Sequence, residues 1–245
     1  MMIHSTKGIV LRTVAYSETS IIAQLYTELF GLQSYLINGV RSGKKSALKS
    51  NLFQPASILE LEVYHNEQKN LQRIREARWH YLYKQIFFNI SKNTVALFIT
   101  ELLQKVIRQP EQNPSLYNFI EDAYMHLDNA DARITAGYPL FFALHLTSFL
   151  GFHINDDYGP DKPLFDLREG EFIKEPPLHP YYIDRDTSAG ISALLKIRLP
   201  EELHQIQLSG EKRRSLLEYI IQFYRLHVQD FGSMKSLPIL REILA

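Results

Sequence analysis

The spacing of apolar residues changes near residue 80, and this change is the strongest constraint on the fold. Before it, apolar residues come in short runs or alternate with polar ones, as at 57–65, which is typical of strands. After it, they recur every three or four residues, as at 95–107, which is typical of amphipathic helices. The two periods belong to different elements. The chain is therefore predicted to be α+β, with strands and helices in separate domains, 1–80 and 81–245.

Five strand-like runs precede residue 80, and turn signals such as 28–31 and 66–70 lie between them. Short strands spaced in this way favour a small five-stranded β-barrel. A polar stretch at 41–50 interrupts the pattern after the third run. The five runs are 9–11, 20–27, 32–40, 57–65 and 71–79.

The second domain is predicted to be all-helical except for one insert. Residues 152–186 contain five prolines and many acidic residues, so we expect an irregular segment there. Pro114 suits the first turn of a helix, and Gly151 suits a C-terminal cap. The predicted helical stretches are 81–90, 95–107, 114–127, 132–150, 216–228 and a short apolar turn at 237–244.

Composition excludes several classes of site. The 245 residues include no cysteine, which excludes disulfides, a thiol nucleophile, iron–sulfur clusters and thiolate-bound zinc. Hydrophobic content of 45% and charged content of 22% are ordinary for a globular protein. The N-terminus has no apolar export signal, and 138–152 is too short to span a bilayer. We expect a cytoplasmic protein with no membrane association.

The net charge of zero is the sum of two unlike halves. Residues 1–80 carry ten positive and six negative side chains, a net charge of +4, and the remainder carries −4. A basic domain beside an acidic one suggests a polyanion partner for the basic half.

The basic residues of the first domain form the candidate DNA-binding site. Arg41, Lys44, Lys45 and Lys49 share one glycine-containing loop, where several cations can reach successive phosphates. Arg73 and Arg75 alternate along the fifth strand and are predicted to point to the same side. Lys7 and Arg12 complete the predicted set.

Two further sets are candidates for contact with DNA or a partner. Tyr16, Tyr35 and Tyr64 have rings on which unpaired bases can stack. Lys212, Arg213 and Arg214 open a helix, where cations oppose the helix dipole and so suggest a ligand or an interface. The alternative interpretation is structural: a solvated basic loop, tyrosines in the core and a solvated helix face.

No motif of an enzyme stands out, and we predict that the protein is not one. Neither a phosphate-binding loop nor a nucleophile elbow is present, and the histidines form no metal-binding pair. Asp156, Asp157, Asp161 and Asp166 do not follow the spacing of a calcium loop, so neither a metal nor another cofactor is expected. A hydrolase that uses this Asp-rich loop remains an alternative, as does a protein-interaction module in which the basic loop is incidental.

Several segments, in order and at matching distances, resemble the bacterial DNA repair and recombination protein RecO family. They include Glu101-Leu102-Leu103 in a helix, a Leu150-Gly151-Phe152 helix end and a Lys235-Ser236 segment. The other matching segments are 8–12, 16–20, 26–31, 38–46, 52–55 and 59–62.

The resemblance implies an OB-fold barrel followed by a helical domain. It also implies a recombination mediator that binds single- and double-stranded DNA, anneals complementary strands and helps to load RecA, as part of the nucleoid. The implied protein partners are RecR and the acidic C-terminal tail of the single-stranded-DNA-binding protein.

Many members of that family carry a four-cysteine zinc site after the Leu-Gly-aromatic helix end, which this chain cannot form. Packing must then replace the metal, and Phe152, Leu164, Phe165 and Phe172 are the candidates. The resemblance also implies a basic residue for the tail within 139–151, where none occurs. Arg133, Lys105 and Arg108 are the nearest in the sequence.

Overall fold

The computed structural model describes residues 2–40 and 50–243. The chain divides into two compact units. The first comprises Met1–Phe87 and Leu103–Asp128, and the second comprises Phe88–Leu102 and Asn129–Ala245. The first unit therefore contains a helical segment in addition to the strand-rich part of the chain.

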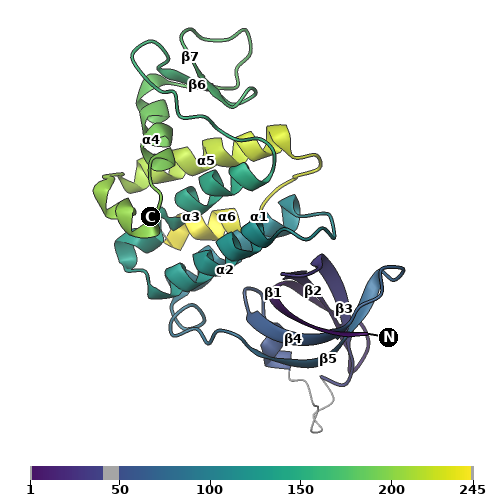
Figure 1. Ribbon diagram of the computed structural model, residues 1–245. Coiled ribbons are helices and arrows are strands. Elements are labelled where there is room, and N and C mark those ends of the chain that lie inside the picture. The colour runs from purple at the N-terminus through teal and green to yellow at the C-terminus, as the bar shows by residue number, and fades with distance from the viewer. Residues whose placement is uncertain (1, 41–49, 244–245) are drawn as a thin grey trace. The chain divides into compact units, whose positions relative to one another are not determined.

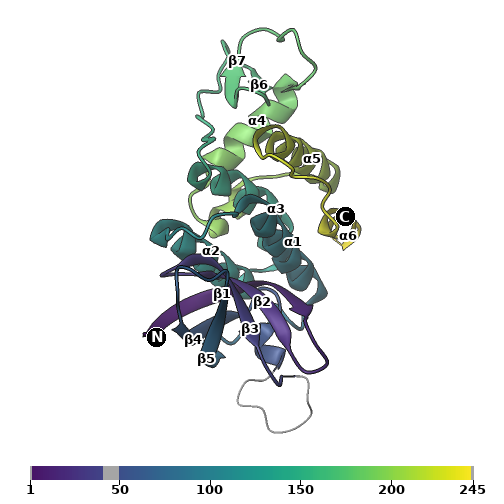
Figure 2. The same cartoon turned by 90° about the vertical axis from the view of Figure 1, so that its right-hand side faces the viewer.

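Five strands of the first unit form a closed barrel (Figures 1 and 2). Neighbours are antiparallel except for the third and fifth strands, which run parallel. The order around the barrel is β1-β2-β3-β5-β4, so every strand has two partners and none presents a free edge. The predicted five-stranded barrel is confirmed. The strands are β1 (Ile3–Ala15), β2 (Ile21–Thr27), β3 (Gly31–Ile37), β4 (Ile58–Tyr64) and β5 (Leu71–Trp79).

The inward-facing residues of the strands fill the barrel, as the alternating pattern requires. On β4, Leu59, Leu61 and Val63 are buried, whereas Glu60 and Glu62 lie between them on the outer side. The short 3₁₀ helix η1 (Ser50–Phe53) adds two residues to the same core. The core consists of Val10, Ile21, Ala23, Leu25, Tyr35, Ile37, Leu52, Phe53, Leu59, Leu61 and Val63.

The β2–β3 turn depends on Gly31. Its φ of +60° is a conformation that glycine adopts at no steric cost. A Cβ atom at this position would also lie 2.2 Å from the carbonyl oxygen of Glu111, which belongs to the same unit. Thr27 closes the turn, because its hydroxyl donates to the Gly31 carbonyl and accepts from the Phe30 amide.

A buried carboxylate holds the connection that follows the barrel. Asp128, at the end of α2 (Pro114–Asn129), accepts hydrogen bonds from the backbone amides of Lys84, Gln85 and Ile86 at 2.8–2.9 Å. These amides donate to a side chain, so the predicted helix over 81–90 does not form. The prediction was wrong because a tertiary contact overrides the local apolar spacing. The first α-helix is α1 (Ile90–Val106), which begins at the end of that stretch.

The second unit has a helical core around α3 (Ala132–Leu146), which is buried along most of its length. Asp131 caps its start by accepting from the Ile134 amide. The predicted helix over 132–150 ends earlier, at Leu146, and a 3₁₀ turn over 147–149 separates it from Gly151, which has a φ of +80°. The Tyr224 hydroxyl donates to the Ala143 carbonyl inside this core. The other helices are η2 (Thr147–Phe149), α4 (Arg185–Leu195), η3 (Pro200–Gln205), α5 (Gly210–His227) and α6 (Ser236–Ile243).

The insert is not wholly irregular, contrary to the prediction. Three short strands, β6 (Leu164–Asp166), β7 (Glu171–Ile173) and β8 (Tyr182–Ile183), form an antiparallel sheet in the order β7-β6-β8 (Figure 1). Phe165 and Phe172 pair across this sheet and are both buried. Strands of two or three residues are too short to show a period in the sequence, which is why the prediction missed them.

Glu101 links two of the segments on which the sequence resemblance rested. Its carboxylate accepts hydrogen bonds from the Lys235 and Ser236 amides at 2.8 Å and from the Ser236 hydroxyl at 2.5 Å. The side chain of α1 therefore caps the N-terminus of α6, a position where negative charge is favourable.

Replacing this cap should have a measurable cost. We expect Glu101→Gln to lower the free energy of unfolding by about 1–2 kcal/mol, because a charged acceptor of three hydrogen bonds is lost. Urea denaturation followed by circular dichroism measures the change. The matched control, Glu175→Gln, alters an exposed residue of the insert and should change stability by less than about 0.5 kcal/mol. Equal losses in both variants would contradict the assigned cap.

Candidate nucleic-acid interface

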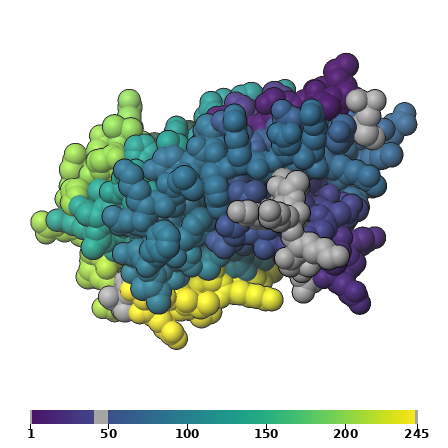
Figure 3. All heavy atoms as spheres, turned by 90° about the horizontal axis from the view of Figure 1, so that it is seen from below, coloured from purple at the N-terminus to yellow at the C-terminus, as the bar shows by residue number. Residues whose placement is uncertain are grey.

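The predicted DNA-binding residues of the barrel divide into two groups. Arg41, Lys44, Lys45 and Lys49 lie outside the described residues. Lys7, Arg12, Arg73 and Arg75 are described, and the structure places them in different surroundings. Figure 3 shows, in purple and blue, one face of the surface formed by the N-terminal part of the chain.

Arg12 and Arg73 lie on one face of the barrel, formed by β1, β2, β3 and the start of β5. Arg12 is directly opposite Gln24 on β2, and Gln24 is opposite Ser34 on β3. In the neighbouring row, Leu36 of β3 is paired with Arg73 of β5. Directly paired residues point to the same side of a sheet. The strand register therefore brings the two guanidinium groups, 61 positions apart in the sequence, to the same face.

We call this surface the basic face. No acidic side chain of the described residues neutralises its two arginines. Both arginines are exposed, and neither has an ion-pair partner within residues 2–40 and 50–243. No acidic side chain occupies the paired positions. The residues at these positions are Arg12, Val14, Ile22, Gln24, Ser34, Leu36, Leu71 and Arg73.

Lys7 is in a different environment, although the sequence grouped it with Arg12. Its Nζ lies 2.7 Å from Oε2 of Glu121 and 3.9 Å from Oε1 of Glu28, and 5.1 Å from the ring centroid of Tyr117. The Glu121 side chain is 11% exposed, so this pair is shielded from solvent. The charge of Lys7 is thus neutralised inside the first unit and attaches β1 to α2.

Arg75 also has an internal partner. Its Nη1 lies 3.2 Å from Oε2 of Glu62. Between Glu62 and Val63 the pairing with β5 shifts by one residue, which leaves Arg75 as the extra residue of a β-bulge. Arg73 and Arg75 are both exposed, but among the described residues only Arg73 has no carboxylate partner.

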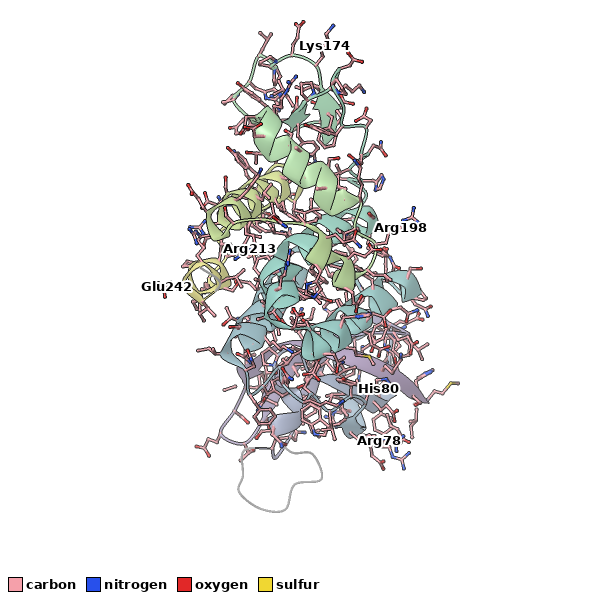
Figure 4. All side chains as sticks on the ribbon, turned by 90° about the vertical axis from the view of Figure 1, so that its left-hand side faces the viewer. Arg78, His80, Lys174, Arg198, Arg213 and Glu242 are labelled. Atoms are coloured by element: carbon pink, nitrogen blue, oxygen red, sulfur yellow. The ribbon has the colours of Figure 1, made fainter. Side chains whose placement is uncertain are left out.

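On the β4 side of the barrel, acidic side chains form ion pairs with basic ones. Arg78 contacts Glu60, and His80 Nδ1 lies 3.2 Å from Oε1 of the same residue. Figure 4 shows Arg78 and His80 near each other at the end of β5. The hydrogen bond from His80, followed by that from Arg78, keeps the pKa of Glu60 below its usual value. The ion-paired side chains therefore lie on the β4 side of the barrel. Arg12 and Arg73, which have no ion-pair partner among the described residues, lie on the basic face.

The three tyrosines predicted to stack on bases have different exposures. Tyr16, in the β1–β2 connection, is 61% exposed, and Tyr64 is half-buried. Tyr35 is fully buried in the barrel core, and burial raises the pKa of its hydroxyl. A base cannot reach it, so that prediction was wrong. Tyr35 alternates inward on β3, a direction that the closure of the barrel decides.

Lys212, Arg213 and Arg214 lie in the first turn of α5, after the N-cap residue Ser209. Arg213 (Figure 4) does not point into solvent, because its Nη1 donates to the Leu208 carbonyl at 2.7 Å. Of the three cations, Arg213 is thus partly held by the unit that carries it.

The sequence reasoning named Arg213 and Arg214 but missed Arg241 and the cleft of the second unit that all three line. A narrow, mostly apolar cleft is lined by Pro139 and Leu140 of α3, Leu217 of α5 and Leu240 of α6, with Arg213, Arg214 and Arg241 beside them. The family resemblance predicted a basic residue within 139–151, and none occurs there. The cations at this position come instead from α5 and α6, and only the packing of the helices brings them there.

Two family models match the chain. The N-terminal model, Recombination protein O N terminal, matches residues 1–83, and the model Recombination protein O C terminal matches residues 88–238. The chain belongs to the recombination protein O (RecO) family. It is 34% identical to the DNA repair protein RecO of Bacteroides fragilis over 99% of each chain. It is also 32% identical to that of Phocaeicola vulgatus over 100% of each chain, and 32% identical to that of Flavobacterium johnsoniae over 98% of each.

Membership of the RecO family identifies the barrel as an OB-fold and links the chain to DNA repair. In OB-folds the second and third strands, with the β1–β2 and β4–β5 loops, form the usual nucleic-acid-binding surface. The basic face includes the outer side of β2 and β3, and its two arginines flank these strands on β1 and β5. Within the described ranges, no helix is long and apolar enough to cross a membrane, and no cluster of three His, Asp or Glu is arranged for a metal.

Proposed function

We propose that this RecO-family protein is a non-enzymatic recombination mediator. It binds single- and double-stranded DNA, anneals complementary strands and assists the loading of RecA. Residues 1–80 are the proposed DNA-binding domain, and residues 81–245 are the part that meets partners. The proposal places the protein in the cytoplasm, associated with the nucleoid.

One observation carries the DNA-binding proposal: Arg12 of β1 and Arg73 of β5 are exposed on one face without acidic residues, and they flank β2 and β3, the strands that bind nucleic acid in OB-folds. The Arg41–Lys49 cations follow β3 in the sequence and extend the proposed site. Lys7 and Arg75 are less suited to it, because Glu121 and Glu62 already neutralise them.

The same surface suggests how annealing works. Two DNA strands repel each other through their phosphates, and cations that neutralise both strands lower this repulsion while raising their local concentration. Neither step requires nucleotide hydrolysis. Exposed Tyr16, in the β1–β2 connection, offers a stacking partner for unpaired bases before they pair.

The double variant Arg12→Ala/Arg73→Ala tests the basic face. We expect about ten-fold weaker binding of a fluorescein-labelled single strand at moderate salt, measured by fluorescence anisotropy. The dependence of log K on log salt should become shallower by about 1.4, because each lost phosphate contact removes about 0.7 for a single strand.

Arg78→Ala is the matched control, because it removes an exposed arginine that Glu60 already pairs. It should leave both the affinity and the salt slope unchanged. An equal loss in the control, or no loss in the double variant, would contradict the assignment of the basic face. The complete absence of salt-dependent binding would favour an OB-fold module that binds only proteins.

Annealing of complementary oligonucleotides tests the loop cations separately. We expect Arg41→Ala, Lys44→Ala, Lys45→Ala and Lys49→Ala together to slow annealing by at least about ten-fold, because four cations are removed from the proposed site. A rate equal to that of the unaltered protein would exclude the loop from the site.

For the protein partners, we propose RecR and the acidic C-terminal tail of the single-stranded-DNA-binding protein. The cleft between α3, α5 and α6 suits such a tail, because apolar side chains lie beside Arg214 and Arg241. Arg241 is partly neutralised by Glu218, at 2.9 Å, so Arg214 is the stronger candidate for the tail carboxylates.

A further inference from the structure

The second unit has another cavity, which lies between α3, α4, η3 and the start of α5. It has a volume of about 560 Å³, within the range of sites for small organic ligands. Arg133 of α3 and Arg213 of α5 line it, together with Leu194, Leu203, Ile206 and Leu208. No acidic residue is among its lining residues, so it carries two positive charges without a counter-charge of its own.

Each guanidinium group has a backbone contact at the cavity, which is short for Arg213 and long for Arg133. Arg213 Nη1 donates to the Leu208 carbonyl at 2.7 Å, and Arg133 Nη2 donates to the Ile206 carbonyl at 3.5 Å. A guanidinium group has five donors, so each of these contacts leaves several N–H groups for other acceptors. In Arg213, fixing one edge of the group also reduces the entropy lost when a ligand binds the other edge.

Arg213 also has a hydrogen-bond donor without an acceptor in the described part of the chain. Its Nε is buried and has no hydrogen-bond partner among the described residues. A buried charged donor without an acceptor is costly, and such sites are characteristic of ligand-binding positions. The cavity also adjoins the first turn of α5, next to the N-cap residue Ser209, where the helix dipole favours an anion.

We propose that this cavity binds a nucleoside 5′-monophosphate, either free or as the phosphorylated end of a DNA strand. A phosphate dianion matches two guanidinium groups better than a single carboxylate does. The leucine and isoleucine side chains provide an apolar surface for the base, and Gln207 and Ser209 supply polar groups at its edge.

Calorimetric titration of the full-length protein with deoxyadenosine monophosphate tests the proposal. We expect saturable binding at one site, and no binding of deoxyadenosine, which lacks the phosphate. Arg133→Ala should weaken the nucleotide by about ten-fold or more, because a charge-assisted contact is lost. Arg133→Lys keeps the charge but not the planar fork, and should give an intermediate affinity.

Arg133 is replaced instead of Arg213, so that a loss of binding can be distinguished from a loss of folding. Arg133 is exposed, so its replacement should not alter the melting temperature, whereas Arg213 is tied to the Leu208 carbonyl. Arg185→Ala is the matched control: Arg185 is an exposed arginine of α4 that does not line this cavity, and its replacement should leave nucleotide binding unchanged.

A 5′-phosphorylated and a 5′-hydroxyl oligonucleotide distinguish the two sources of the ligand. A preference for the phosphorylated strand that Arg133→Ala abolishes identifies a strand end, and equal binding of both strands identifies the free nucleotide. The DNA-end version rests on the proposed function, but the mononucleotide titration does not, so the two can fail separately. Absence of nucleotide binding, insensitivity to Arg133→Ala, or binding of an acidic peptide at this cavity in place of the nucleotide would overturn the proposal.

Discussion

Replacing Phe165 with alanine is expected to lower the free energy of unfolding by about 3–5 kcal/mol. Phe165 is 1% exposed, and its ring centroid lies 5.0 Å from that of Phe172 and 6.1 Å from that of Phe223 on α5. The substitution therefore opens a cavity where the small sheet meets a core helix. Urea denaturation followed by tryptophan fluorescence and circular dichroism measures the loss.

The control for this prediction is Leu178→Ala, in the same insert. The Leu178 side chain is fully exposed, so its truncation should change stability by less than about 0.5 kcal/mol. A loss below about 1 kcal/mol for Phe165→Ala would mean that the sheet contributes little to the folded state.

The large effect is expected because the chain has no cysteine, so neither a disulfide nor thiolate-bound zinc can hold this sheet, and packing must hold it. The replacement of a metal by packing stays a prediction, which the burial of Phe165 and Phe172, two of its four candidates, supports. Phe165 and Phe172 are buried, and the half-buried Phe152 stacks on His227 with ring centroids 5.3 Å apart. The Asp166 carboxylate also contacts His179 Nε2 at 3.2 Å, which adds a polar link in place of ligation.

Asp128→Asn is the second substitution with a large expected effect, about 3 kcal/mol of lost stability. The buried carboxylate accepts from three consecutive backbone amides, and hydrogen bonds to a charged acceptor contribute about 1.5–3 kcal/mol each without being additive. An asparagine amide has only one acceptor atom, and its NH₂ group would face N–H donors.

Amide hydrogen exchange tests directly whether Asp128 protects the three amides that donate to it. The amides of Lys84, Gln85 and Ile86 should exchange much faster in the variant, because they lose their acceptor. Asp122→Asn, on the exposed side of the same helix, removes an equal charge and should leave both exchange and stability unchanged. Unaltered protection of the three amides in Asp128→Asn would contradict the assigned role.

The barrel, the main helices and the family could be predicted because their signals are local. Alternation in β4 and the helical spacing in α2 depend on neighbouring residues, and the interior of the fold selects the same pattern. The 81–90 stretch shows the limit of such signals. Its apolar spacing is helical, but Asp128, more than 40 positions away, binds the amides that the helix needs.

By itself, the sequence determined that a basic, strand-rich segment precedes an acidic, helical one, and that no cysteine is present to bind zinc. Only the tertiary structure decided which cations are available to a ligand. Lys7 and Arg12 are five positions apart, yet Lys7 pairs with Glu121, 114 positions away, and Arg12 is exposed without an acidic partner among the described residues. The reason is physical: charge is a property of a residue, whereas its neutralisation depends on which distant carboxylate the strand register and helix packing bring within reach.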